Sequence, residues 1–190
     1  ISIYPDNPSG HGGEDMRFRF RWPAPIAGSP HDANVVYHAG NVLFRTKDGG
    51  KTWEKLSGDL TRNDKAKQKW SGGPITGDNT TAEFYCTISA VAESPRQAGV
   101  IWVGSDDGLV HLSKDNGKTW TNLTGKLPEF PEWATIKMIE ASRYDAGTAY
   151  VVVDAHMLGD TRPYLFKTTD FGDTWESLSD IMPGSNFLHV

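Results

Sequence analysis

The sequence predicts an all-β fold made of similar units, each with four short antiparallel strands. Three observations support this prediction: an eight-residue motif occurs three times, the 190 residues include 20 glycines and 7 tryptophans, and short β-branched or aromatic runs alternate with turn-forming residues. Many glycines together with many aromatic residues favour a turn-rich β protein over a helical one.

The repeated motif, which we call the turn motif, reads Ser/Thr-x-Asp-x-Gly-x-Thr-Trp. Its copies span residues 46–53, 113–120 and 168–175. A similar segment precedes each copy at a variable distance, which indicates constant strands joined by loops of different length. The shared positions are Asp48, Gly50, Thr52 and Trp53, then Asp115, Gly117, Thr119 and Trp120, then Asp170, Gly172, Thr174 and Trp175.

The middle repeat shows the order of strands within one unit. Strands are expected at 87–92, 100–104, 109–113 and 120–123. Asp107-Gly108 marks a tight hairpin between the second and third strands, because Asp-Gly is a strong signal for a two-residue turn. The turn motif then joins the third strand to the fourth. Four short antiparallel strands per repeat are typical of a β-propeller blade.

Each shared residue of the turn motif has an expected structural role. The Asp carboxylate accepts hydrogen bonds from backbone N–H groups across the turn. The Gly adopts a positive φ that other residues resist. The Trp is large enough to fill the seam, meaning the packed interface between two neighbouring blades.

The turn motif also contains a Gly-Lys-Thr tripeptide in its first two copies, as in the end of a phosphate-binding loop. Such a loop needs another glycine five residues earlier, where this chain has Arg45 and Leu112. The third copy has Asp173 in place of the lysine. The repetition therefore indicates that the motif has a structural role in each repeat and does not form a nucleotide site.

Three copies of the motif resemble the Asp-box, or BNR, repeat of sialidases, xyloglucanases and sortilin-type propellers. The segments 19–22, 77–80 and 145–150 extend the similarity to large bacterial secreted proteins with a sortilin-like propeller. This resemblance implies a periplasmic or extracellular location. It also implies either a binding role, as in sortilin-type propellers, or glycoside hydrolysis, as in xyloglucanases.

The domain organisation expected from these repeats is a single partial β-propeller over residues 1–190. Its approximate blades are 17–57, 84–124 and 134–179, and 186–190 begins a further blade. Propellers close with about four or more blades. The expected partners are therefore the remainder of the same propeller or neighbouring subunits.

Composition excludes several other partners. With 19 basic and 24 acidic residues the formal net charge is −5, so we expect no nucleic-acid partner. No apolar run approaches the ~20 residues of a membrane helix, so we expect no membrane span.

The single cysteine, Cys86, has no Cys or paired His neighbours and is expected to be a small buried residue. We expect no metal and no other cofactor.

Candidate site residues lie in the connections on the face opposite the turn motifs. The long stretch 58–84, the insertion 154–163 and the segment 130–133 all join that face, and long loops are often functional. Each candidate also has a plainer explanation, as a solvated polar side chain or a packing aromatic. The binding candidates are Trp70, Glu83, Trp133, Asp154, His156 and Arg162.

Arginine alternates with aromatic residues between residues 17 and 22. A strand here would place three arginines on one side and the aromatic rings on the other. Sialidases hold a carboxylate with three arginines from separate blades, and no Arg-Ile-Pro sequence occurs here, so sialidase activity is not supported. The alternative is that these arginines line a wet surface or pair with acids.

Three functions remain open from the sequence. The first is a non-catalytic module that binds a protein, peptide or glycan through its loop face. The second is a xyloglucanase-like hydrolase with paired carboxylates, for which Asp78 with Glu83 is one candidate pair. The third is a structural subunit of a larger assembly. No catalytic residue is assigned.

Overall fold

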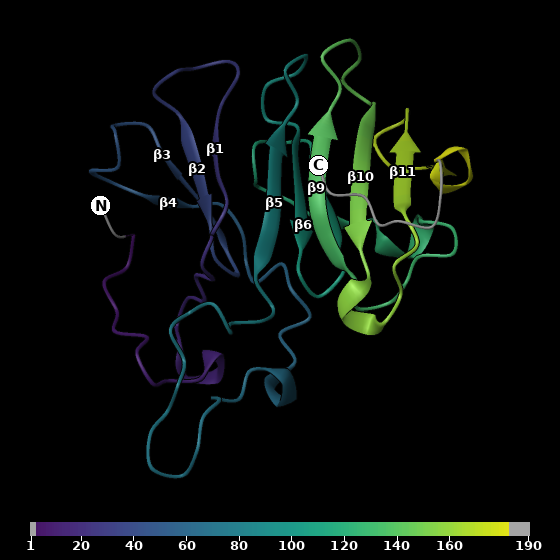
Figure 1. The fold of residues 1–190 in the computed structure, drawn as a ribbon. Helices are drawn as coiled ribbons and strands as arrows, with labels where there is room; N and C mark the ends of the chain where they lie inside the picture. Colours follow the sequence, from purple (N-terminus) through teal and green to yellow (C-terminus); the bar gives the residue numbers. More distant parts are fainter. Residues whose placement is uncertain (1–2, 183–190) are drawn as a thin grey trace.

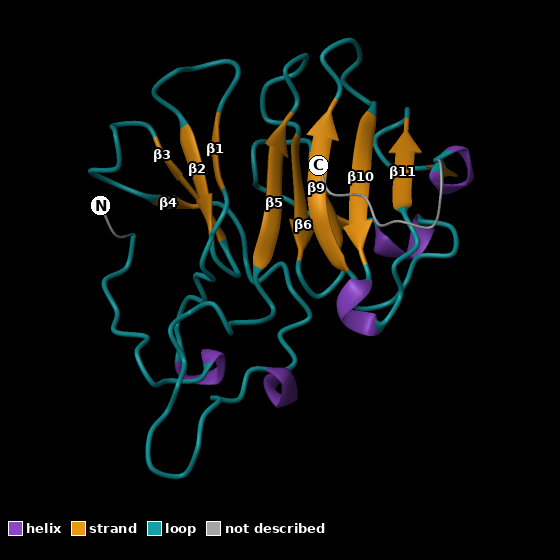
Figure 2. Cartoon of the chain, viewed as in Figure 1, coloured by secondary structure: helices purple, strands orange, loops and turns teal. Residues whose placement is uncertain are grey.

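The computed structural model describes residues 3–182, and strands form most of its regular structure (Figure 2). The first sheet contains β1 (Ile26–Gly28), β2 (Val36–Ala39), β3 (Leu43–Thr46) and β4 (Glu54–Lys55). The second contains β5 (Ile88–Glu93), β6 (Ile101–Ser105), β7 (Val110–Ser113) and β8 (Thr121–Asn122). The third contains β9 (Thr135–Ala141), β10 (Ala149–Asp154), β11 (Tyr164–Thr168) and β12 (Glu176–Ser177).

All strand pairs are antiparallel and join neighbours along the chain, so each sheet is a four-stranded meander. The sheets stand next to one another in chain order (Figure 1). The all-β prediction of four-stranded antiparallel units is confirmed. The described helices are short 3-10 turns: η1 (Gly13–Asp15), η2 (Lys65–Lys67), η3 (Thr124–Lys126), η4 (His156–Leu158) and η5 (Ser179–Ile181).

Two apolar clusters fill the seams between the sheets. Successive side chains of β6 point to opposite faces of its sheet. Ile101 and Val103 therefore pack against the first sheet, while Trp102 packs against the third. Gly104 lies so close to β9 that a Cβ atom on it would be 2.3 Å from Cγ2 of Ile136. Only a residue without a side chain fits at this point between the second and third sheets.

The turn motifs adopt the same hydrogen-bond pattern in all three copies. Asp48 Oδ1 accepts from the Thr52 N–H at 2.9 Å, and Oδ2 accepts from the Thr52 hydroxyl at 2.7 Å. Asp115 and Asp170 make the equivalent bonds. These bonds, above all the one from the Thr hydroxyl, lower the pKa of each Asp to about 2. The expected left-handed glycines are Gly50, Gly117 and Gly172, with φ of 83°, 87° and 79°.

Two motif tryptophans lie in seams, as expected. The Trp120 Nε1–H donates to the Leu56 carbonyl of the first sheet at 3.1 Å. Trp175 packs edge-on against Trp102 of the second sheet, with ring centroids 6.1 Å apart. Trp53 occupies the same motif position in the first sheet, and its buried Nε1–H has no hydrogen-bond partner among the described residues.

The N-terminal segment differs from its prediction. Residues 17–22 form no strand, and the first sheet begins at Ile26. Arg19 is 2% exposed, and its buried charge is satisfied by Asp59 at 2.8 Å and by the Cys86 carbonyl at 3.1 Å. These side-chain bonds, and not a strand ladder, hold the segment in place. The three sheets fall within the proposed blade limits, and the expected further blade at 186–190 lies outside the described residues.

Candidate functional site: a pocket on the loop face

Three connections that leave one end of the sheets, β4–β5, β8–β9 and β10–β11, are longer than any connection at the other end. Consecutive antiparallel strands place the β4–β5 and β10–β11 connections at the end opposite the turn motifs. Figure 1 shows both connections, with η2 and η4, along the same lower side of the molecule. We call this side the loop face.

A pocket with a volume of about 460 Å³ opens among these connections. Its walls come from the N-terminal segment, the β4–β5 connection, the segment before β9 and the insertion after β10. We call it the loop-face pocket. It is lined by Arg21, Lys67, Tyr85, Trp133, Ala134, Thr135, Asp154, Met157 and Leu158.

Trp133 is held in the pocket wall by cations and by its backbone. The Arg62 guanidinium lies 4.3 Å from the ring centroid, and the Lys67 ammonium lies 4.8 Å from it. A cation at this distance is attracted to the negative face of the indole. The backbone of Trp133 has a φ of 69°, an uncommon conformation for a bulky residue. Such strain concentrates at binding and catalytic sites.

Asp154 is the only carboxylate among the residues that line the loop-face pocket. Its Oδ1 lies 2.6 Å from the His156 Nδ1 and accepts from the His156 N–H at 3.0 Å. Burial alone would raise the pKa of Asp154, but these bonds lower it below its usual value. The pocket therefore presents one ionised acid that is already paired with a histidine.

Two buried acids contact arginines next to the pocket. The Asp106 side chain is fully buried and accepts from the Thr87 N–H at 2.8 Å and hydroxyl at 2.7 Å. Burial raises the pKa of Asp106 to about 6. The Arg21 guanidinium reaches it at 3.4 Å. Asp107 is also buried and accepts from the Arg62 N–H at 2.8 Å. Asp106 thus holds Arg21, which lines the pocket, and Asp107 holds Arg62, which lies over Trp133.

The structure brings only part of the predicted set together. Trp133 and Asp154 line the loop-face pocket, and His156 touches it through Asp154. Glu83 instead caps a turn by accepting from the Thr80 N–H at 2.7 Å. Arg162 is clamped to Asp160, with Nη2 2.6 Å from Oδ2. Trp70 is 45% exposed and does not line this pocket.

Sequence reasoning did not select the other seven lining residues, namely Arg21, Lys67, Tyr85, Ala134, Thr135, Met157 and Leu158. Two of them carried a usable signal. Met157 and Leu158 are apolar residues inside an otherwise polar insertion, and they are 83% and 52% exposed in the structure. Arg21 belonged to the arginine and aromatic alternation, but nothing in that pattern indicated which arginine would reach a pocket.

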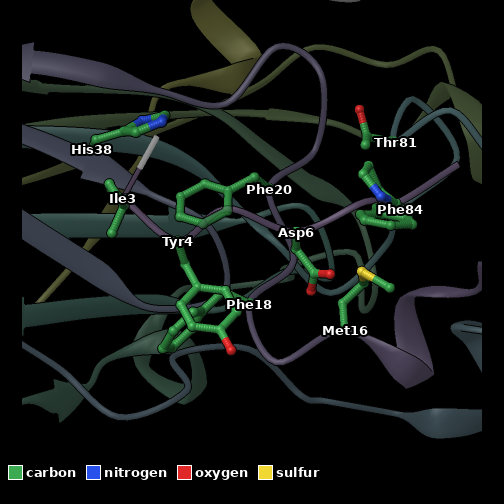
Figure 3. Close-up of a pocket in the computed structure, with 10 residues that line it drawn as sticks. Ile3, Tyr4, Asp6, Met16, Phe18, Phe20, His38, Thr81 and Phe84 are labelled. Atoms are coloured by element: carbon green, nitrogen blue, oxygen red, sulfur yellow. The ribbon is translucent and has the colours of Figure 1, made fainter. Parts of the chain in front are cut away.

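Aromatic residues form a second hollow on the outer face of the first sheet (Figure 3). It has a volume of about 230 Å³ and includes Tyr4, Phe18, Phe20 and His38 in its lining. Phe18 and Phe20 pack on Phe44 of β3, with ring centroids 5.0 and 6.0 Å apart. We call this surface the outer aromatic face.

Neither surface contains a metal site within the part of the chain that the structure describes. No group of three or more His, Cys, Asp or Glu residues there could hold a metal ion. Among the same residues, no helix has the length and apolar character needed to cross a membrane.

Comparison with known proteins shows a likeness in fold alone. No protein-family model and no curated protein matches the sequence. An ancestral GH74 enzyme superposes with a TM-score of 0.56 at 19% identity, over 93% of this chain and 19% of that chain. A GH74 xyloglucanase from Xanthomonas campestris gives 0.53 at 18% identity, over 85% and 23%. YCF48 bound to D1 peptide gives 0.50 at 16% identity, over 94% and 46%.

These structures are β-propeller proteins, and the chain shares their arrangement of four-stranded sheets. The chain spans about a fifth of the length of the ancestral GH74 enzyme. Propellers of this kind include glycoside hydrolases and a peptide-binding protein, so the likeness does not choose between catalysis and binding. The choice depends on the chemistry of the loop-face pocket.

Proposed function

We propose that this chain is a non-catalytic β-propeller module that binds a protein, peptide or glycan partner in the loop-face pocket. One observation carries the proposal: the pocket combines exposed apolar side chains with a single carboxylate. Exposed Met157 and Leu158 give a partner a surface to bury. A pocket of about 460 Å³ also lies within the usual size of ligand sites.

The hydrolase alternative is less well supported. Glycoside hydrolysis needs two carboxyl groups that face each other at about 5 to 9.5 Å. Asp154 has no second acid across the loop-face pocket, and Glu83 is used in a turn elsewhere. The buried acids Asp106 and Asp107 have no exposed surface from which to reach a substrate.

Binding and turnover can be tested together. The chain is applied to peptide and glycan arrays, and in parallel to xyloglucan and arabinan with detection of reducing ends. We expect bound ligands without product. Leu158→Asp should abolish binding, and Lys118→Glu, a change on an exposed residue of the second turn motif, should not. The proposal would be contradicted if the chain hydrolysed one of these polysaccharides and Asp154→Asn or Glu83→Gln abolished the hydrolysis.

We further propose that the outer aromatic face packs against the remainder of the propeller or a neighbouring subunit. The repeat supports this assignment: Trp120 and Gly117 of the second sheet both pack onto Leu56 of the first. Trp53 holds the same position in the first sheet without a partner for its Nε1–H. A preceding sheet with a carbonyl at the place of Leu56 would supply one.

This second assignment has its own test. In the assembled protein, Trp53→Phe should lower the unfolding temperature as much as Trp120→Phe does. In the 190-residue chain alone it should have the smaller effect. Equal and small effects in both samples would show that no sheet packs on this face. The Asp-box assignment and a periplasmic or extracellular location remain parts of the proposal that rest on the sequence resemblance.

A further inference from the structure

We propose that the loop-face pocket recognises a peptide carboxylate that lies next to an apolar side chain. This inference rests on the proposed function and names its ligand. Two cations, Arg21 and Lys67, and one acid, Asp154, line the pocket. The lining side chains thus carry one more positive than negative charge, whereas the whole chain has a formal net charge of −5.

The charge of Lys67 is available to a ligand. Its side chain is exposed and lies over Trp133, and it has no carboxylate partner among the described residues. The Arg21 side chain is 41% exposed, and its contacts with Asp106 and with the Ala82 carbonyl, at 3.4 and 3.3 Å, are long. An ionised ligand oxygen at normal distance would make a stronger, charge-assisted bond with either group.

The acids around the pocket already accept hydrogen bonds or ion pairs from groups other than Lys67. Asp154 is bound by His156, and Glu132 pairs with Arg62 at 3.0 Å. Asp106 accepts from Thr87, and Asp107 accepts from the Arg62 N–H and the Ser105 hydroxyl. Lys67 and Arg21 are therefore the cations with capacity left for an anion.

The apolar half of the pocket lies on η4. Met157 and Leu158 are flexible aliphatic side chains and are more than half exposed. An apolar ligand side chain placed over them gains roughly 25 cal/mol for each Å² removed from water. Positive charge beside an aliphatic surface is complementary to an acidic residue followed or preceded by an apolar one.

The same contacts favour a peptide over a glycan. Sugar recognition uses the open face of an aromatic ring as a platform, and two cations already lie over the ring of Trp133. Met157 and Leu158 offer few hydrogen-bonding atoms to sugar hydroxyls. A peptide can use both the cations and the aliphatic surface at once.

The experiment is a selection of random twelve-residue peptides on the 190-residue chain by messenger-RNA display, followed by titration calorimetry of the best sequences. Each peptide is made with a free and with an amidated C-terminus, which separates a terminal carboxylate from an acidic side chain. Binding is measured for the wild type, Lys67→Met and Arg21→Met. Lys118→Met removes the same charge on the motif face and is the control, and Leu158→Asp reports on the pocket itself.

We expect selected peptides with an acidic residue or free terminus beside an apolar residue. Lys67→Met and Arg21→Met should each weaken binding about tenfold, as loss of one charge-assisted hydrogen bond predicts. Lys118→Met should leave it unchanged, and raising NaCl from about 50 to about 500 mM should weaken it.

Two other results have different meanings. The selected peptides could be neutral or basic, lose binding with Leu158→Asp and bind Lys67→Met and Arg21→Met as tightly as the wild type. This result would overturn the carboxylate assignment, and the proposed binding function would stand. Failure to select any peptide, or binding that Leu158→Asp does not change, would overturn the assignment of a peptide site to this pocket.

Discussion

The indole nitrogen of Trp120 lies 3.1 Å from the carbonyl oxygen of Leu56 and so joins the turn motif of the second sheet to the last strand region of the first. The same N–H is shared with the Gly117 carbonyl at 3.2 Å. The turn motif thus stabilises its own hairpin and the seam beside it. Trp175 has a related role, because its Nε1–H donates to the Gly172 carbonyl at 3.1 Å and its ring packs on Trp102 of the second sheet.

Trp120→Phe should lower the free energy of unfolding by about 1–3 kcal/mol, because the buried Leu56 carbonyl loses its donor. Trp53→Phe is the matched control, since its Nε1–H has no partner among the described residues. It should cost less in the isolated chain. Urea unfolding followed by circular dichroism measures both, and an equal loss would disprove the role of the bond across the seam.

Gly117→Ala should destabilise the chain by about 1–3 kcal/mol. Its φ is 87°, and an added Cβ atom would lie 3.0 Å from the Cβ of Leu56. Gly125→Ala is the control, because that glycine has open space around it and no left-handed φ. The melting temperature of Gly117→Ala should therefore lie clearly below that of Gly125→Ala. Similar melting temperatures would argue against a tight seam.

The three motif carboxylates should make the fold sensitive to acid. Their pKa of about 2 lies below the usual 3.8, so the ionised forms stabilise the folded state at neutral pH. This contribution is present above pH 4 and is lost as pH falls towards 2. Asp115→Asn should lower stability at pH 7 and flatten the acid dependence between these values. A pH titration of the unfolding midpoint tests this, and an unchanged slope would contradict it.

Two buried groups should change the stability of the fold in opposite directions between pH 4 and 6. Burial raises the pKa of Asp106 from 3.8 to about 6 and lowers the pKa of His111 from 6.5 to about 4. The Asp106 contribution is full below pH 4 and is lost as pH rises through 6. The His111 contribution is full above pH 6.5 and is lost as pH falls to 4. Each amounts to roughly 3 kcal/mol, with opposite sign.

Single variants should show the pH dependence of stability that each group contributes. Of these two contributions, Asp106→Asn keeps that of His111, so stability should rise with pH between 4 and 6. In His111→Gln only the Asp106 contribution remains, so stability should fall over the same range. Urea unfolding at several pH values measures both slopes. The assignment would be wrong if the two variants showed slopes of the same sign.

The strands could be predicted because their signals are local. Asp107-Gly108 sets the hairpin between β6 and β7, and β7 ends where the second turn motif begins. The Asp48 bonds to Thr46 and Thr52 also stay within one turn, so a single octapeptide specifies them. Residue type and spacing were therefore enough to predict the four strands of each unit.

The candidate site could be predicted only in part, because distant segments assemble it. Arg21 comes from the N-terminal segment, and Lys67, Trp133 and Leu158 come from three different connections. Their meeting depends on how the three sheets stack. Arg19 shows the same limit: the alternation predicted a strand, but a partner at Asp59 holds this residue in the core. Sequence reasoning selected the face on which this pocket lies and two of its lining residues, Trp133 and Asp154.

The most direct test of the account is to locate the bound ligand by amide chemical-shift mapping on the ¹⁵N-labelled chain. The tightest ligand from the arrays is titrated in, and shifts are assigned along the backbone. We predict that the largest changes fall on Tyr85, Thr135 and Leu158 in the loop-face pocket. Changes centred on the turn motifs at 46–53, 113–120 or 168–175 would contradict the account, because the turn motifs would then form the binding surface.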